Sequence, residues 1–178
     1  MKKRHFITLF ALVVLLFGCN SATETLVEQK IPENVDTEFC LISQDGKIYE
    51  LNSEFSFANI KPMSVESGSG DGFKWEIYTY PTIEIKALIS DDGKKHINKI
   101  TTTSSGFQTP RGIEIGDDEA KLLEAYNGED LKISYLGRTP GYFGYMYDPE
   151  DDIGFNKIFF DFENSKIERI TLENCIDG

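Results

Sequence analysis

Few side chains in this sequence could carry out catalysis. The 178 residues contain two histidines, of which His5 lies in the N-terminal targeting segment. His96 stands beside Lys94 and Lys95 at the start of an expected strand, where a surface position is favoured. No Ser-His-Asp or Cys-His set can be assembled without it. Acidic residues are then the only catalytic candidates. The sequence therefore predicts a protein that is not an enzyme, with no catalytic residue and no cofactor.

An acidic run occupies one expected turn and suggests calcium. It consists of Asp148, Glu150, Asp151 and Asp152. The run departs from an EF-hand loop, because Ile153 stands where that loop requires glycine and no glutamate follows at the twelfth place. We expect a solvated acidic turn and no metal site, with calcium binding as the alternative. The glycines at residues 68–72 precede a strand rather than a helix, which argues against a phosphate-binding loop.

Cys19 has the clearest chemical context. A positive segment, Lys2-Lys3-Arg4, precedes an apolar run at residues 6–17, which is long enough for a secretory signal and too short for a membrane span. The run ends in Leu-Phe-Gly-Cys, which resembles the bacterial lipobox, where a signal peptidase cuts before a diacylglyceryl cysteine. We expect residues 1–18 to be a lipoprotein signal peptide and Cys19 to carry acyl chains such as palmitate. An ordinary signal peptide is the alternative.

Lipid on Cys19 implies a location and a tether. Two or more acyl chains hold a protein stably on a bilayer, at ~0.8 kcal/mol per buried methylene. We expect the protein to be exported and anchored to a bacterial membrane, on the periplasmic or cell-surface side. Residues 19–36 contain few large apolar side chains and are expected to form a flexible tether.

Two further cysteines, Cys40 and Cys175, lie at opposite ends of the expected folded region. An exported chain meets an oxidising environment, so a disulfide between them is the expected pairing. In the chain-entropy model a loop of this length contributes up to ~5 kcal/mol of stability. The alternative is two buried thiols.

Charge limits the partners of the protein. The formal net charge is −12, and removal of residues 1–18, which hold three basic and no acidic residues, changes it to −15. Phosphate backbones would repel such a chain, so nucleic-acid binding is not expected. Anionic lipid would also repel it, apart from the anchor. A protein partner is expected.

Most of the remaining sequence alternates as β-strands do. Asp45-Gly46 separates apolar runs at residues 39–43 and 47–51, and Asp91-Asp92-Gly93 separates runs at 82–90 and 96–103, so two hairpins are expected. Other strands are expected at residues 74–80, 131–136, 142–147, 155–162 and 167–172. Residues 64–72 are expected to be a mobile loop.

One helix is strongly indicated between residues 117 and 128. Asp117 suits its N-cap, and Asn127-Gly128 can supply a left-handed stop. Leu122, Leu123 and Tyr126 form an apolar stripe at three- and four-residue spacing. A weaker helix is expected at residues 53–60. The expected fold class is α+β, a mainly antiparallel sheet with one principal helix packed on one face.

A faint repeat divides the chain into a β-rich half at residues 37–106 and a helix-plus-antiparallel-sheet half at 107–178. At an offset of 70, Ile97, Ile100 and Thr101 match Ile167, Ile170 and Thr171, and at 68 Trp75 falls over Phe143. We expect the halves to form one compact domain. A duplicated helix-plus-strands unit is one explanation of the repeat, and chance alternation of β-rich sequence is the other.

Strand alternation also predicts a candidate partner-binding face. In the strands at 74–80 and 142–147, Trp75, Ile77, Phe143 and Tyr145 are expected to face the core. Four other side chains then point the opposite way: Tyr78, Tyr80, Tyr142 and Met146. Tyr and Met are frequent in interfaces, so this face is a candidate site. The alternative is that this side of the sheet is also packed.

A known family carries similar motifs. They are Thr109-Pro110-Arg111-Gly112-Ile113-Glu114-Ile115-Gly116-Asp117, the helix end Tyr126-Asn127-Gly128 and the closing segment at 167–172. They resemble small bacterial lipoproteins of the SmpA/OmlA group, which assemble the outer membrane. More distantly they are similar to β-lactamase inhibitor protein, which doubles such a unit and binds its target with a concave sheet. The resemblance covers about residues 107–174.

These observations together predict a membrane-anchored bacterial lipoprotein. We expect a non-enzymatic binding or support protein of the cell envelope that acts through protein–protein contacts. The alternative is an inhibitor or a module that captures a small ligand.

Overall fold

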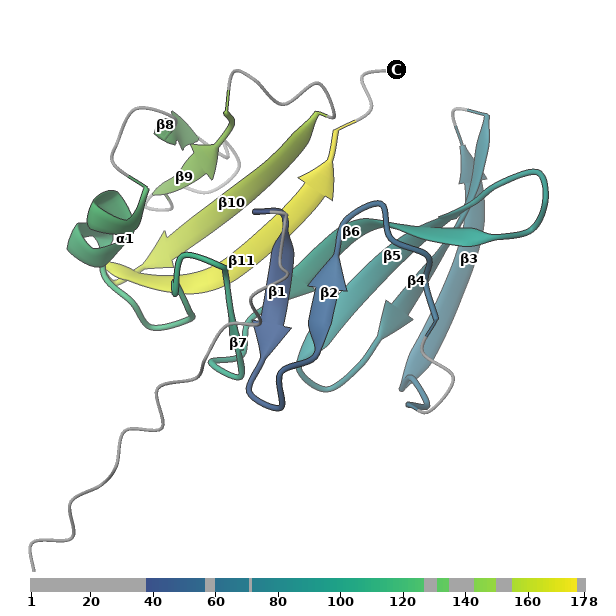
Figure 1. Cartoon of the computed structure of the whole chain (residues 1–178), viewed down its shortest axis with the longest axis horizontal. Helices are drawn as coiled ribbons and strands as arrows, with labels where there is room; N and C mark the ends of the chain where they lie inside the picture. Colours follow the sequence, from purple (N-terminus) through teal and green to yellow (C-terminus); the bar gives the residue numbers. More distant parts are fainter. Residues whose placement is uncertain are drawn as a thin grey trace, which may run out of the picture.

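The computed structural model describes residues 38–56, 60–70, 72–126, 131–134, 143–149 and 155–175. Two antiparallel sheets dominate this part of the chain, together with one short helix (Figure 1). The predicted α+β class with a dominant antiparallel sheet is therefore confirmed. The predicted signal peptide, the predicted lipidation site Cys19 and the predicted tether lie outside the described residues.

The large sheet has eight strands in the order β3-β4-β5-β6-β11-β10-β9-β8. Its first four strands form one meander and its last four form another, and β6 joins β11. The strands are β3 (Ser64–Gly70), β4 (Phe73–Thr79), β5 (Ile83–Ile89), β6 (Lys95–Thr102), β8 (Leu131–Ser134), β9 (Phe143–Tyr147), β10 (Asn156–Glu163) and β11 (Lys166–Asn174).

The small sheet has three strands in the order β2-β1-β7. They are β1 (Cys40–Ser43), β2 (Ile48–Glu50) and β7 (Phe107–Gln108). The Asp45-Gly46 turn joins β1 to β2 as predicted, and Gly46 takes the positive φ of 79° that favours glycine. Because β7 belongs to the C-terminal half and pairs with β1, both halves contribute to both sheets.

Helix α1 (Glu119–Ala125) begins one residue later than predicted. Asp118 is its N-cap and accepts a hydrogen bond from Lys121 N at 3.0 Å, whereas Asp117 accepts one from Glu114 N at 2.9 Å in the preceding turn. Leu122 is fully buried, but Leu123 is exposed, so the predicted apolar stripe is narrower than expected.

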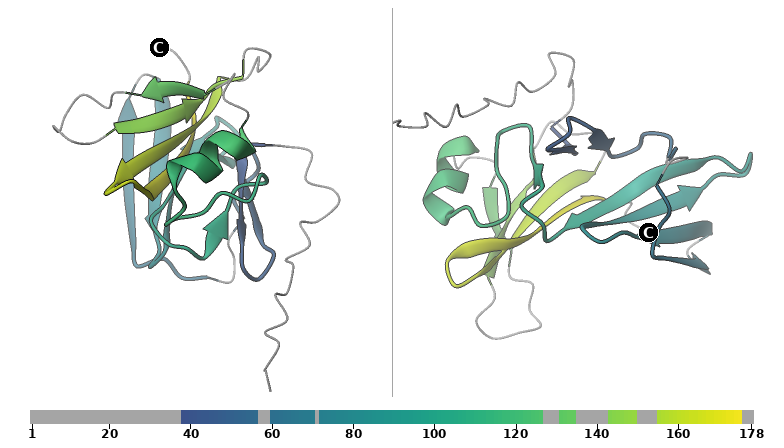
Figure 2. Two further views of the ribbon diagram at one scale, coloured as in Figure 1. Left: turned by 90° about the vertical axis from the view of Figure 1, so that its left-hand side faces the viewer. Right: turned by 90° about the horizontal axis from the view of Figure 1, so that it is seen from below.

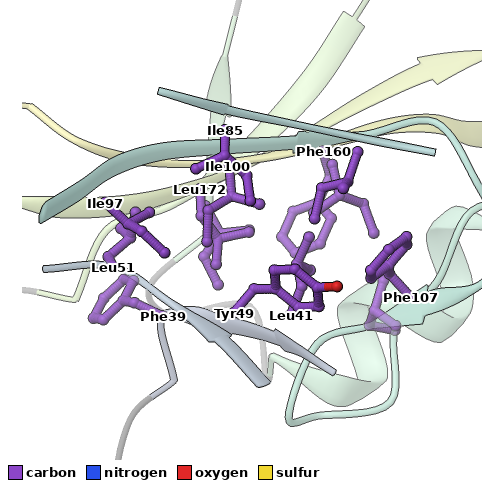
Figure 3. Close-up of a cluster of buried hydrophobic side chains, with 14 of the residues drawn as sticks. Phe39, Leu41, Tyr49, Leu51, Ile85, Ile97, Ile100, Phe107, Phe160 and Leu172 are labelled. Carbon is purple, nitrogen blue, oxygen red and sulfur yellow. The ribbon is translucent and has the colours of Figure 1, made fainter. Parts of the chain in front are cut away.

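The small sheet and α1 lie on the same side of the large sheet (Figure 2). The core fills the space between them. A cross-strand row in the large sheet faces it: Tyr78, Ile85, Ile100, Leu172, Ile158, Tyr147 and Leu131. Opposite this row lie Leu41 and Tyr49 of the small sheet and Phe107 of β7 (Figure 3).

Two of the predicted secondary-structure elements are wrong in the described residues. Residues 64–70 form strand β3 rather than a mobile loop. Residues 53–56 form no helix, and Glu54 instead makes a β-bridge with His96. The helical part of the predicted duplication therefore has no support before β3.

Candidate binding surfaces

The residues with catalytic potential do not converge in the described structure. His96 lies on β6, where its cross-strand neighbour is Leu88. Among the described residues, no group of three or more His, Cys, Asp or Glu side chains is arranged to hold a metal ion. Of the predicted acidic turn only Asp148 is described, and it pairs with Lys132 at 2.9 Å. The other acidic residues of that turn lie outside the described part.

The cysteine pair is not joined in the structure. Cys40 is buried in β1, where burial, and after it the charge of Glu50, raises the pKa of the thiol to about 12. Cys175 follows β11, and its N–H donates to Phe155 O at 3.0 Å. The two sulfur atoms are not at disulfide distance.

The predicted partner-binding face is wrong for β4. Tyr78 and Tyr80 are each 8% exposed and belong to the core. The tyrosine ring at position 78 packs on Phe55 with centroids 4.3 Å apart, and its hydroxyl accepts from Lys95 Nζ at 2.7 Å and donates to Glu76.

A register error of one residue explains the misplacement. The sequence repeat matches Trp75 with Phe143 and therefore Tyr78 with Met146. In the sheet, Tyr78 is instead equivalent to Tyr145. Tyr78 lies opposite the buried Ile85, and Tyr145 lies opposite the buried Phe160. A shift of one residue moves every side chain to the other face. In β9 the predicted faces are right: Tyr147 is buried in the core, and its neighbour Met146 points the opposite way. Tyr142 lies outside the described residues.

The opposite side of the large sheet is open among the described segments. We call this surface the open face, and define it by five half-buried apolar side chains: Trp75, Ile77, Leu88, Met146 and Phe159. Strand pairing places them there, because each alternates with residues that face the core. Neither α1 nor the small sheet covers this face (Figure 2).

Charged side chains lie between the two apolar ends of the open face. The cross-strand row runs from Ile77 through Lys86, Lys99 and Glu173 to Lys157. Lys99 pairs with Glu173 at 3.0 Å, and Lys86 Nζ lies 5.8 Å from the centroid of the Trp75 ring. The open face thus combines aromatic, aliphatic and basic groups on a rigid sheet.

Trp75 lies across the edge strand β3. A methyl group at position 68 would overlap the indole ring, so Gly68 leaves the space that this ring occupies. From the sequence alone, the glycines of this segment were expected to be loop residues. The role of Gly68 follows only from the pairing of residues 64–70 with residues 73–79, which the sequence of this segment does not reveal.

Arg111 connects the start of the folded chain to the end of α1. Its Nε donates to Glu38 Oε1 at 3.1 Å, and its terminal nitrogens donate to Ala125 O at 3.3 Å and Tyr147 Oη at 3.1 Å. The guanidinium also lies over two rings, 4.6 Å from the Tyr126 centroid and 5.0 Å from the Tyr147 centroid. We call this arrangement the Arg111 clamp. It joins three separate segments of the folded chain.

A small apolar pocket opens between the two sheets. Its volume is about 110 Å³, and its wall contains three aromatic rings, Tyr49, Tyr80 and Phe107. Ile60, Pro81, Thr82 and Ile83 complete the lining. Burial raises the pKa of both tyrosine hydroxyls, so both are protonated at neutral pH. This pocket could accept one small apolar or aromatic group.

No helix in the described part of the chain has the length and apolar character needed to cross a membrane. Comparison with protein families, with curated proteins and with solved structures gives no match.

Proposed function

We propose that this chain is a non-enzymatic binding protein, anchored to a bacterial membrane through lipid on Cys19, that contacts a protein partner with the open face. The observation that carries the proposal is the open face itself: a rigid sheet surface with Trp75, Phe159 and Met146 on it that no described segment covers. The resemblance to envelope lipoproteins of the SmpA/OmlA group agrees with this role and is itself part of the proposal.

The composition of the open face favours a protein partner. Large aromatic residues and Met are enriched in interfaces, and apolar surface left on a folded domain often marks an interaction site. The two apolar ends of the face lie four strands apart, which is about 19 Å at the usual strand spacing. A partner that covers both ends would span a surface of the size that stable interfaces need.

We also propose that the two meanders of the large sheet descend from one doubled unit, without a doubled helix. Thr101 and Thr171, which are 70 residues apart, face each other where β6 pairs with β11. Each meander has one bulge, and the extra residue is Asn98 in the first and Glu168 in the second, again 70 residues apart. Bulges are specific features of a strand pair, so their equivalent positions support common descent.

Photo-crosslinking from the open face tests the binding role. A benzoylphenylalanine at position 159 replaces a similar ring, and one at position 88 probes the other apolar end. Both should join the full-length chain in its native membrane to the same protein. The same group at Ser105, an exposed residue on the small-sheet side, is the control. Equal adducts from all three positions, or none from positions 88 and 159, would refute the binding face.

The anchor is tested separately. The native chain should incorporate labelled palmitate and Cys19→Ala should not, because Cys19 is the residue on which we propose the lipid. Equal labelling of both proteins, or no labelling of the native chain, would overturn the lipid anchor and leave the open face untouched.

The apolar pocket favours a second function, capture of a small ligand with an aromatic or branched aliphatic end. Phenol is a suitable probe because it matches the three-ring wall. It should raise the melting temperature of the native chain and fail to do so for Ile60→Trp, which fills the pocket from an exposed position. Equal shifts in both proteins would exclude this site.

A further inference from the structure

Strand β3 is the end strand of the large sheet and presents an unprotected edge. It pairs with β4 over all seven residues from Ser64 to Gly70, without a register shift. Its other side has no neighbouring strand among the described residues. Such an edge presents a row of backbone N–H and C=O groups that can pair with another chain.

The usual protections of an edge are missing from β3. Natural proteins shorten edge strands, or give them proline, bulges or several charges. Strand β3 has seven residues, no proline, no bulge and one charged side chain, Glu66. The other end of the sheet is different, because β8 has four residues and includes Lys132.

Exposed apolar side chains collect around this edge. Eight large hydrophobic residues are exposed in the described structure, and four of them belong to β3, to its lead-in or to the start of β4. They are Ile60, Met63, Val65 and Phe73, of which Met63 is 72% exposed. A monomer would leave these groups in water, whereas a strand added at this edge would cover part of them.

We propose that β3 pairs antiparallel with β3 of a second copy of this chain, centred on Ser67, to form a homodimer with one continuous sheet. A two-fold axis perpendicular to the sheet keeps the open faces of both copies on one side and the core faces on the other. Such an axis requires that one residue of β3 lies directly opposite the same residue of the second copy. Centring on Ser67 uses all seven residues of β3.

This register also separates the charges. Glu66 of one copy lies opposite Gly68 of the other, whereas centring on Glu66 would set two carboxylates against each other. The Trp75 ring fills the space above Gly68, so the Glu66 side chain of the second copy lies beside that ring. The Trp75 indole lies across Gly68 on the same face, with the ring carbon Cζ2 nearest to that position. Each indole ring thus has the Glu66 side chain of the other copy as its neighbour across the interface.

Cysteine pairing tests the register. Directly opposed residues in an antiparallel pair have Cα atoms about 4.5–5.5 Å apart, within the range that a disulfide spans. Ser67→Cys in the full-length membrane-bound chain should give a covalent dimer on a non-reducing gel under mild oxidant. Ser105→Cys and the native chain measure collisional background and bonds formed by the native cysteines.

Two further variants decide between this register and other pairings. Val65→Cys by itself, and Ser69→Cys by itself, should each give no more covalent dimer than the background. When the two variants carry different tags and are produced together, Cys at 65 of one copy should crosslink to Cys at 69 of the other. A Ser67→Cys signal no higher than that of Ser105→Cys, or a strong dimer from Val65→Cys alone, would overturn the proposal.

A charge at the centre of the pairing provides an independent measurement. Ser67→Lys sets two ammonium groups opposite each other, so the full-length chain in detergent should sediment as a monomer where the native chain sediments as a dimer. Lys at Ser105 should leave the dimer intact. A native chain that is monomeric at all concentrations would also overturn the proposal.

Discussion

Replacing Arg111 should destabilise the fold far more than replacing an ordinary surface arginine. The clamp includes three groups from separate parts of the chain: Glu38 at the start of the folded region, the Ala125 carbonyl at the end of α1, and Tyr147 of β9. Arg111→Ala removes every one of these contacts at once and exposes the Tyr126 ring to the space left behind.

The magnitude follows from the exposure of each group. Glu38 is 41% exposed, so its ion pair is screened and contributes about 0.5–1 kcal/mol. The side chain of Arg111 is 27% exposed, which places each contact with the Tyr126 and Tyr147 rings near ~1 kcal/mol. The hydrogen bonds to the carbonyl and the phenol add about 0.5–1.5 kcal/mol each. These terms overlap, and we expect a loss of about 2–4 kcal/mol for Arg111→Ala.

Urea unfolding followed by tryptophan fluorescence measures this loss, because Trp75 is the only tryptophan. Arg111→Lys keeps the charge but loses the planar fork and should cost about 1–2 kcal/mol. Glu38→Gln should cost under about 1 kcal/mol. Lys121→Ala, which breaks an exposed pair with Asp117, is the control and should change stability by under about 0.5 kcal/mol. If Arg111→Ala costs no more than Lys121→Ala, the clamp contributes nothing and the reasoning is refuted.

Three further predictions use other parts of the structure. Gly68→Ala should displace the Trp75 ring and shift its fluorescence emission, with a modest loss of stability because the ring can move toward solvent; unchanged emission would contradict the placement of the ring. Burial raises the pKa of Asp161 despite the nearby charge of Arg169. Because the folded-state pKa exceeds the unfolded one, the contribution of Asp161 to the free energy of unfolding is lost as pH rises through the folded-state pKa. Asp161→Asn should therefore increase the free energy of unfolding at pH 7 and have little effect near pH 3, and a loss at pH 7 would refute this sign. The raised pKa and burial of Cys40 should make its thiol unreactive toward alkylating reagents in the native protein. Thiol titration after unfolding without reductant then tests the predicted bond to Cys175: two thiols would exclude it, and none would establish it.

Local turn chemistry made much of the fold predictable. The Asp-Gly and Asp-Asp-Gly signals mark turns at which Gly46 and Gly93 adopt positive φ, and the strands around them alternate clearly. The strands after α1 were also predicted within a few residues of their bounds. These elements have buried faces, so hydrophobic spacing along the chain reports their structure directly.

Strand β3 could not be predicted by the same means. Its residues are small or polar and almost all exposed, so the segment has the composition of a loop. Pairing with β4 holds it in place. This pairing leaves no hydrophobic periodicity in the sequence of β3 itself. The weak helix expected at residues 53–60 failed for the converse reason, because backbone bonds to β6 and a packed Phe55 ring override a modest helical preference.

The open face was predicted with the wrong residues in β4. Alternation shows that Trp75 and Tyr78 lie on opposite sides, but it cannot show which side faces the core. Because both sides of β4 carry aromatic residues, the repeat decided which side was expected to face the core. The repeat was aligned one residue out of register with the sheet. Only the position of the segment after β2, whose Phe55 ring packs on Tyr78, decides the matter.

The Arg111 clamp has a mechanical consequence at the point where the chain enters its folded part. If Cys19 is fixed in a membrane, any force on the protein travels through the tether and arrives at Glu38. The next element is β1, the middle strand of the small sheet, which is bonded on both sides, to β2 and β7. Glu38 is also joined to the end of α1 through Arg111, so tension spreads to the helix and β9 before any strand slides. Without Arg111, the same pull would act on β1 alone and detach the small sheet at lower force.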